Sequence, residues 1–217
     1  MIRGVIFDLD GVLVTTDELH YRAWKELADA EGIYFDRRIN DRLRGVSRME
    51  SLGILLERSP RAYSEEEKAA LAERKNARYR ELLQSLTPAD VLPGVREVLG
   101  GLRTRGVRTA VASSSRNAAA ILERTGLAGA FDAAVDGNDI RHSKPHPEVF
   151  LLAAGRLGLA PAECLVVEDA MAGIEAGRRA GMAVFGIGTP EMLPGIRNLA
   201  TDLAHVTVDE LLRADRE

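Results

Sequence analysis

Short apolar runs alternate with helical segments along the second half of the chain. Four runs have the composition of strands buried on both faces, at residues 107–112, 131–135, 164–167 and 182–187. Helical patterns lie between them, at residues 117–124, 147–157 and 170–180. An alternation of this kind predicts a doubly wound parallel sheet of the α/β class, in which the carboxyl ends of the strands meet at one edge.

A further apolar run at residues 2–7 predicts the first strand, and a block with helical character separates it from the others. Asp17 is expected to cap the first helix of this block, which would end near Gly32. We therefore predict two domains. One is a core formed by residues 1–16 and 88–217, and the other is an inserted all-helical cap formed by residues 17–87.

Two serines give the block its clearest helix starts. Ser47 is followed three positions later by Glu50, and Ser64 is followed in the same way by Glu67. Each pair fits a capping box, in which the serine and the glutamate each accept a hydrogen bond from the other's backbone N–H. The second pair is expected to open a long helix that continues to about Leu83.

Composition excludes several classes of protein. The 217 residues carry 29 Lys and Arg against 33 Asp and Glu, and a net charge of −4 gives no reason to expect a nucleic-acid partner. The single cysteine, Cys164, excludes an internal disulfide and is expected to lie in the core. No apolar run approaches the ~18 residues of a membrane span, and the first apolar run reaches Asp8 too soon for a signal peptide. A cytoplasmic location without a membrane partner is therefore expected.

Polar residues occur in four clusters where predicted strands end. The clusters are Asp8 with Asp10, Ser113 with Ser114 and Ser115, Lys144 with Pro145, and Glu168 with Asp169. Taken singly, each cluster fits an ordinary turn, cap or surface segment. Because strand ends of a parallel sheet share one edge, we expect the four clusters to meet in one cleft.

Such a cleft predicts magnesium-dependent phosphoryl transfer. Neighbouring carboxylates repel one another unless a cation lies among them, and oxygen ligands suit Mg²⁺. Lys144 would add positive charge for a phosphoryl group, and the Ser113 hydroxyl can donate to a phosphoryl oxygen. One carboxylate of the Asp8–Asp10 pair can act as nucleophile and the other as general acid and base.

The segment Phe7-Asp8-Leu9-Asp10-Gly11-Val12, followed by Thr16, resembles the first motif of the haloacid dehalogenase-like phosphotransferases. Ser113, Lys144-Pro145 and Glu168-Asp169 resemble the other three motifs in order and spacing. Further residues are similar to those of the β-phosphoglucomutase family within that superfamily: His20, Trp24, 44–48, 51–52, 74–76, 85–90 and 112–117.

The resemblance implies interconversion of β-D-glucose 1-phosphate and D-glucose 6-phosphate, with Mg²⁺ as cofactor and β-D-glucose 1,6-bisphosphate as activating intermediate. Asp8 would be the phosphorylated nucleophile, and Asp10 would move the proton of the sugar hydroxyl. Ser113 and Lys144 would hold the transferring phosphoryl group. The implied metal ligands are Asp8, Asp10 through its backbone carbonyl, and Asp169, with Glu168 either as a ligand or as a partner of the ligands. Thr16 and His20 would position Asp10.

The resemblance also implies a substrate site between cap and core, in which Arg48 grips the second phosphate of the bisphosphate. The whole implied set comprises Trp24, Arg44, Gly45, Val46, Ser47, Arg48, Lys75, Ser114, Ser115, Arg116 and Asn117. Lys75 and Asn76 also fit ordinary exposed helix residues. The partners would be small sugar phosphates, and a monomer is the family's usual state.

Two other functions are compatible with parts of the pattern. A sugar-phosphate phosphatase of the same superfamily would use the same Asp8 and Asp10, but water would take the phosphoryl group. The basic segment 44–48 favours a mutase, because a bisphosphate needs a second phosphate site. A receiver-type signalling domain also combines acids, Mg²⁺, a hydroxyl and a lysine, but in a shorter chain without a cap.

His142 and His146 flank Lys144 and are expected to be loop residues, because no third ligand for zinc is apparent.

Overall fold

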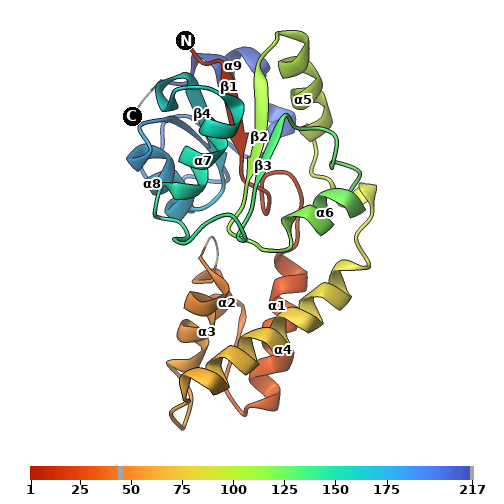
Figure 1. The fold of residues 1–217 in the computed structure, drawn as a ribbon, viewed down its shortest axis with the longest axis vertical. Helices are drawn as coiled ribbons and strands as arrows, with labels where there is room; N and C mark the ends of the chain where they lie inside the picture. Colours follow the sequence, from red (N-terminus) through yellow and green to blue (C-terminus); the bar gives the residue numbers. More distant parts are fainter. Residues whose placement is uncertain (44–45, 216–217) are drawn as a thin grey trace.

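The computed structural model describes residues 1–43 and 46–215, and its centre is a sheet of parallel strands (Figure 1). The strand order is β3-β2-β1-β4-β5-β6, and every neighbouring pair is parallel. The strands are β1 (Gly4–Phe7), β2 (Arg108–Ala112), β3 (Ala133–Val135), β4 (Cys164–Glu168), β5 (Ala183–Ile187) and β6 (Leu199–Ala200). The doubly wound parallel sheet predicted from the alternation is confirmed, with β1 at its centre.

Helices cover both faces of the sheet. Side chains of β1 alternate between two apolar clusters, with Val5 and Phe7 in one and Ile6 in the other. The first cluster includes side chains of α5 (Val95–Thr104), α6 (Ala118–Arg124) and α9 (Val208–Arg213). The second includes side chains of α7 (Glu148–Leu157) and α8 (Met171–Arg179). Because both faces are covered, the interior positions of the strands are mostly apolar rather than alternating, and the polar residues Arg108 and Glu168 stand at strand ends.

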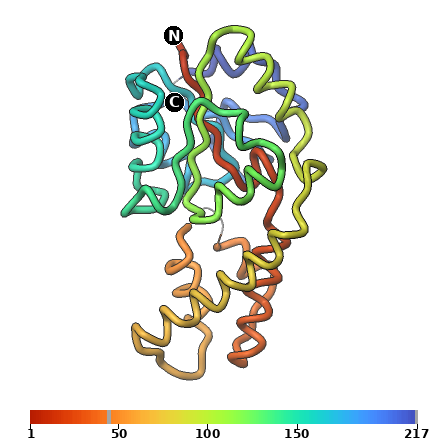
Figure 2. Tube along the Cα trace, turned by 45° about the vertical axis from the view of Figure 1, so that its right-hand side comes forward, coloured from red at the N-terminus to blue at the C-terminus, as the bar shows by residue number. Residues whose placement is uncertain are grey.

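Among the described residues, four α-helices form the block that follows β1 and precedes η1 (Pro88–Asp90), and Figures 1 and 2 show them at one end of the molecule. They are α1 (Asp17–Ala30), α2 (Arg37–Asp41), α3 (Arg48–Leu56) and α4 (Glu65–Leu83). Both predicted capping boxes are present, at Ser47 and at Ser64. The block has an apolar cluster of its own, which includes Trp24, Leu27 and Leu52.

Asp17 does not cap α1, contrary to the prediction. Thr16 occupies the cap position and Asp17 is the first helical residue. The Thr16 side chain makes no cap hydrogen bond, because its hydroxyl donates to the carboxylate of Asp10 instead. The start of α1 is thereby tied to the loop that follows β1.

The sequence patterns did not predict several short helices and strands. They are α2, α5, α9, β6 and three 3₁₀ helices, η1 (Pro88–Asp90), η2 (Pro161–Glu163) and η3 (Leu203–His205). β6 has two half-buried residues and pairs along one side only. α5 contains Gly100 and Gly101, which lower its intrinsic helix propensity, and its amphipathic burial of Val95, Val98 and Leu102 compensates.

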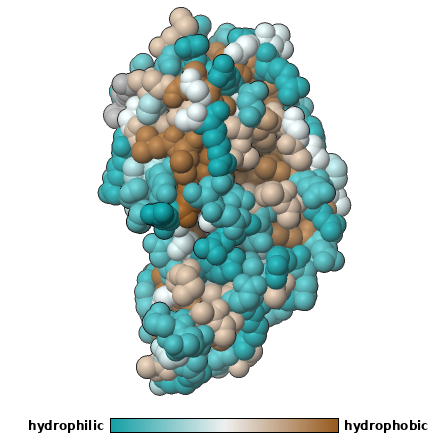
Figure 3. Space-filling model, in the orientation of Figure 1, coloured by the Kyte–Doolittle hydropathy of each residue, from teal (hydrophilic) through white to brown (hydrophobic). Residues whose placement is uncertain are grey.

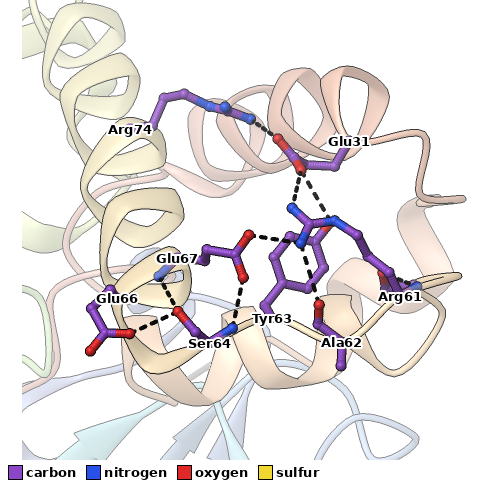
Figure 4. Close-up of polar contacts among 9 residues, drawn as sticks. Glu31, Arg61, Ala62, Tyr63, Ser64, Glu66, Glu67 and Arg74 are labelled. Carbon is purple, nitrogen blue, oxygen red and sulfur yellow. Dashed lines mark hydrogen bonds and ion pairs between the residues drawn. The ribbon is translucent and has the colours of Figure 1, made fainter.

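A polar network fastens the α3–α4 connection to the end of α1 (Figure 4). Glu31 accepts hydrogen bonds from Arg74 at 2.6 Å and from the Tyr63 hydroxyl at 3.1 Å. The guanidinium of Arg61 lies 3.8 Å from the centre of the Tyr63 ring and donates to Glu67 at 2.8 Å. The network therefore links the end of α1, the α3–α4 connection and the first three turns of α4.

On the face shown in Figure 3, hydrophobic residues gather over the sheet-bearing part, and hydrophilic residues predominate on the helical block. Cys164 is buried and free, as expected for a core residue. Within residues 1–43 and 46–215, no helix combines the length and the apolar character that spanning a membrane requires.

Candidate active site

The loop after β1 brings two carboxylates to the carboxyl edge of the sheet. Asp8 follows Phe7 directly, and its backbone N–H donates to the carbonyl of Val167 on β4 at 2.9 Å. Gly11 has a φ of +86°, and a Cβ there would lie 2.2 Å from a carboxylate oxygen of Asp169. A glycine is therefore required for Asp169 to approach this loop.

Lys144 connects its own cluster to those of Asp8 and Glu168. Its side chain is 1% exposed, and Nζ donates to Asp8, to the carbonyl of Ala112 at 3.3 Å and to Glu168 at 2.5 Å. Burial alone would lower the pKa of Lys144, but the charges of Asp8 and Glu168 outweigh it and raise that pKa above its ordinary value. Lys144 is therefore a permanent cation between two carboxylates.

Negative charge is nevertheless in excess at this edge. Burial raises the pKa of Asp8 well above its ordinary value. Lys144 opposes that shift, whereas the charges of Glu168, Asp169 and Asp10 add to it. Asp10, Glu168 and Asp169 thus surround Asp8 with negative charge that Lys144 offsets only in part, and a divalent cation relieves an excess of this kind.

Asp10 is held by a different partner. Its carboxylate accepts a hydrogen bond from the Thr16 hydroxyl. Burial raises the pKa of Asp10 to about 6, and the bond from Thr16 limits the rise. A carboxyl group with this pKa holds and releases a proton near neutral pH, which suits a general acid and base.

Residues from the first and last helices of the block meet above Asp10. Nζ of Lys75 on α4 lies 2.9 Å from Nδ1 of His20 on α1. The ammonium also lies 4.8 Å from the centre of the Trp24 ring and 4.4 Å from that of Tyr79, whose ring stacks on His20. Burial lowers the pKa of Lys75 to about 7, and burial together with Lys75 lowers the pKa of His20.

Ser113 is buried at the end of β2, where its hydroxyl oxygen accepts from the N–H of Ser115 at 3.1 Å. The hydroxyl hydrogen can therefore still be donated to a ligand. The neighbouring Ser114 hydroxyl is buried and has no hydrogen-bond partner among the described residues. Both hydroxyl groups are thus available to an anionic group in the cleft.

Polar side chains of the core and of the helical block approach each other at the cavity. The amide nitrogen of Asn117, just before α6, donates to the amide oxygen of Asn76 on α4 at 3.0 Å. Arg48 at the start of α3 contacts Glu73 on α4 at 3.3 Å and lies within electrostatic range of Arg116 in the core. The two parts of the chain therefore face each other across polar groups.

A cavity of about 890 Å³ lies between these groups, a size suited to a small phosphorylated ligand. The described residues from the predicted site that line it are Asp8, Asp10, His20, Trp24, Val46, Ser47, Arg48, Lys75, Ser113, Ser114, Ser115, Arg116, Asn117, Lys144, Glu168 and Asp169. Thr16 is buried behind Asp10 and does not line the cavity. Arg44 and Gly45 lie outside the described residues.

Sequence reasoning gave no role to Tyr79 and left Asn76 undecided, and both line the cavity. Lys75 and Asn76 are 3% and 7% exposed, so the interpretation that they are exposed helix residues is wrong. Tyr79 lies four residues after Lys75, and this spacing places both on one face of α4. The spacing could therefore have identified Tyr79 as a residue of the cavity.

The donor set fits a magnesium ion. The carboxyl groups of Asp8 and Asp169 lie at the loop where Gly11 leaves room for Asp169, and the backbone carbonyl of Asp10 belongs to the same loop. Carboxylate oxygens are hard ligands of the kind that Mg²⁺ prefers. Glu168 is occupied differently, because it binds Lys144 and accepts from the N–H of Ala170 at 2.8 Å.

Comparisons with known proteins agree with this geometry. Residues 2–181 match the family described as haloacid dehalogenase-like hydrolase. A β-phosphoglucomutase from Bacillus subtilis is 41% identical over 218 residues, which cover 100% of this chain and 96% of that protein. A fructose-1-phosphate phosphatase, YqaB, from Escherichia coli is 35% identical over 82% of this chain and 93% of its own length.

A solved structure is similar over nearly the whole chain. The crystal structure of a β-phosphoglucomutase from Clostridium difficile superposes with a TM-score of 0.92 and 38% sequence identity. The match covers 96% of this chain and 95% of that one. The similarity therefore includes the helical block as well as the sheet.

Proposed function

The chain belongs to the haloacid dehalogenase-like hydrolase family, and from this premise we propose that it is a β-phosphoglucomutase. The proposed reaction interconverts β-D-glucose 1-phosphate and D-glucose 6-phosphate through β-D-glucose 1,6-bisphosphate. The observation that carries the proposal is the single cavity that has Asp8 and Asp10 at one side and the α3 residue Arg48 at another. A bisphosphate needs a reacting position for one phosphate and a basic position for the other.

Asp8 is the proposed nucleophile. Its carboxylate takes the phosphoryl group from the bisphosphate, and Asp10 gives its proton to the departing sugar oxygen. In the second half of the reaction, a hydroxyl group of the sugar monophosphate takes the phosphoryl group from Asp8 and its proton passes to Asp10. The pKa of about 6 lets Asp10 serve in both directions.

Lys144, Ser113 and Ser114 are proposed to bind the transferring phosphoryl group. Lys144 is held in place by Glu168, so its charge is already oriented before the ligand arrives. The two serine hydroxyls are available for donation, as their bonding shows. Electrostatic stabilisation by fixed groups of this kind is the main requirement of phosphoryl transfer.

Asp8, Asp169 and the backbone carbonyl of Asp10 are proposed to hold Mg²⁺, which is typical of the family. The chemistry supplied by the bound ion would be neutralisation of negative charge on the phosphoryl oxygens. Lys144 supplies only one positive charge against four carboxyl groups. The bisphosphate is proposed as the activating intermediate, because Asp8 must be phosphorylated before a monophosphate can react.

Residues 17–87 are proposed to act as a cap domain over a core formed by residues 1–16 and 88–217. The separate apolar cluster around Trp24 and Leu52 supports this division. Arg48, Lys75 and Asn117 are proposed to bind the sugar or its second phosphate from the two sides of the cavity. A closed cap would exclude water from phosphorylated Asp8, which a mutase requires.

A sugar-phosphate phosphatase is the second candidate, supported by the similarity to the fructose-1-phosphate phosphatase. The two functions differ in what accepts the phosphoryl group from Asp8.

A coupled assay distinguishes the mutase from the phosphatase. The protein receives Mg²⁺, β-D-glucose 1-phosphate and a trace of the bisphosphate, and D-glucose 6-phosphate is followed with a dehydrogenase while free phosphate is measured in parallel. Rapid formation of D-glucose 6-phosphate with little free phosphate supports the mutase, whereas dominant free phosphate overturns it.

A further inference from the structure

The segment between β3 and α7 gathers a group of side chains that the proposed reaction does not use. His142 and His146 flank Lys144 in the chain, and Glu148 begins α7. A ring nitrogen of each histidine and a carboxylate oxygen of Glu148 all lie within 4.8 Å of one another. Within residues 1–43 and 46–215, no other set of three His, Cys, Asp or Glu side chains gathers its ligand atoms this closely.

The separations suit a small transition-metal ion. Nδ1 of His142 lies 3.0 Å from Oε2 of Glu148, and Nδ1 of His146 lies 3.9 Å from the same oxygen. Metal–ligand bonds of 2.0–2.1 Å place two ligands of a tetrahedral zinc ion about 3.4 Å apart. The two observed distances lie on either side of that value, so small side-chain rotations would complete the arrangement.

The carboxylate of Glu148 is oriented before any ion arrives. It accepts hydrogen bonds from the backbone N–H groups of Arg141 at 3.1 Å and His142 at 2.9 Å. The N–H of His146 donates to the carbonyl of Ser143 at 2.9 Å, which closes the intervening turn. The two imidazole rings are tilted by 38° relative to each other, and their centres lie 4.6 Å apart. Held ligands lose less conformational entropy on binding than mobile ones do.

We propose that His142, His146 and Glu148 form a second metal site, for a divalent ion of the zinc type. Two imidazole nitrogens and one carboxylate favour zinc and related transition metals, whereas the oxygen ligands at Asp8 favour Mg²⁺. Three protein ligands leave a position for water or for another ligand. The side chains of the two histidines are 64% and 51% exposed, so an ion can enter from solvent.

The site would lie at the edge of the catalytic cavity, because His142 and His146 line that cavity as well. An ion bound there would add positive charge beside the segment that carries Lys144. The third ligand, Glu148, was not apparent from sequence because its carboxylate folds back over the turn to reach both histidines.

Metal binding is tested directly, without an activity assay. The protein, freed of any histidine-containing tag, is saturated with millimolar Mg²⁺ and then titrated with Zn²⁺ by calorimetry, and with Co²⁺ by visible absorption. The expected result is one equivalent of tightly bound Zn²⁺ that Mg²⁺ does not displace. His142→Ala and His146→Ala should each weaken that binding at least ~10-fold while circular dichroism stays unchanged.

His205→Ala is the matched control. His205 is also an exposed histidine paired with a carboxylate, that of Asp202 at 2.7 Å, but no third ligand joins this pair among the described residues. Its removal should leave the affinity for Zn²⁺ unchanged. Equal affinity in the His142→Ala, His146→Ala and unaltered proteins would overturn the proposal, as would the absence of Zn²⁺ binding in the presence of Mg²⁺. Loss of the Zn²⁺ equivalent in Asp169→Asn alone would also overturn it, by assigning the ion to the catalytic carboxylates.

Discussion

Nζ of Lys75 lies 2.9 Å from Nδ1 of His20, and the rings of Trp24 and Tyr79 enclose the pair. The ammonium is almost completely buried, and the neighbouring imidazole is kept neutral by the lowered pKa of His20. A cation held in this way costs free energy of folding, which points to a role in binding rather than in stability.

Lys75→Met should therefore stabilise the protein near pH 7, by about 1–3 kcal/mol, because methionine fills a similar volume without a buried charge. Turnover should fall, because the variant lacks a charge that faces the cavity. The pKa of Lys75 is about 7 in the folded chain, against the ordinary value of 10.5. The unfolded chain thus binds more protons between these values, and the unaltered protein gains stability as pH rises through that window.

Chemical denaturation at pH 7 and at pH 9 measures both parts of this prediction. The advantage of Lys75→Met should shrink at the higher pH, because the unaltered protein then holds a neutral Lys75. Lys68→Met is the control, since Lys68 is on the same helix and forms an ion pair with the exposed Glu65. A Lys75→Met protein that is less stable than the unaltered one at pH 7 would contradict the account.

The two half-reactions should respond to pH in opposite directions. Asp10 must carry a proton when the bisphosphate phosphorylates Asp8, so that step should slow as pH rises above about 6. Asp10 must lack a proton when a sugar hydroxyl attacks phosphorylated Asp8, so that step should slow as pH falls below about 6. Single-turnover experiments measure the two rates separately. One starts from the unphosphorylated protein and the bisphosphate, and the other from the protein phosphorylated on Asp8 and a sugar monophosphate.

Asp10→Asn supplies the control for these profiles. The amide cannot exchange a proton in this range, so both profiles should become flat and turnover should fall ~10²–10⁴-fold. Asp8→Ala should abolish phosphoryl transfer altogether. Near-normal turnover in Asp10→Asn would show that another group moves the proton.

Thr16 is expected to act through Asp10, because it is buried behind that carboxylate and donates to it. Thr16→Val keeps the shape but removes the hydroxyl, which lowers the pKa of Asp10 in the unaltered protein. Its loss should raise the apparent pKa in both half-reactions and lower kcat with little change in KM. Thr16→Ser should restore the profile. A change in KM alone would contradict the positioning role.

Arg48 should matter more for a bisphosphate than for a small phosphoester. It lies across the cavity from the Asp8 loop, and its guanidinium can bind a second phosphate with two hydrogen bonds. Arg48→Ala should reduce mutase activity ~10²-fold, while hydrolysis of p-nitrophenyl phosphate changes by less than ~3-fold. Arg42→Ala, which removes a surface ion pair with Glu57, is the control and should leave both rates unchanged. Equal losses on both substrates for Arg48→Ala would exclude the second-phosphate role.

Much of the fold could be predicted because its signals are local. Both capping boxes depend on residues three positions apart, and the buried strands are apolar on both faces. The meeting of Lys144 with Asp8 and Glu168 followed from a general property of parallel sheets, that their strand ends share an edge. The short elements α2 and β6 carry too few residues for a periodic pattern.

Contacts between distant elements were harder to foresee. Lys75 and Asn76 carry polar side chains on a highly charged helix, and only the packing of α4 against α1 and the core buries them. The side chain of Thr16 had two possible partners, the helix N-terminus and Asp10, and the choice depends on how the loop after β1 folds. Glu148 joins His142 and His146 through a turn whose shape the residue types do not specify.

The central claim is that the phosphoryl group on Asp8 passes to a sugar rather than to water. The most direct test incubates the protein and Mg²⁺ with ³²P-labelled β-D-glucose 1,6-bisphosphate and excess β-D-glucose 1-phosphate, and measures how the label divides between sugar phosphates and free phosphate. The account predicts that nearly all of the label stays in sugar phosphates through many turnovers. Label that accumulates mainly in free phosphate would contradict it and identify a phosphatase.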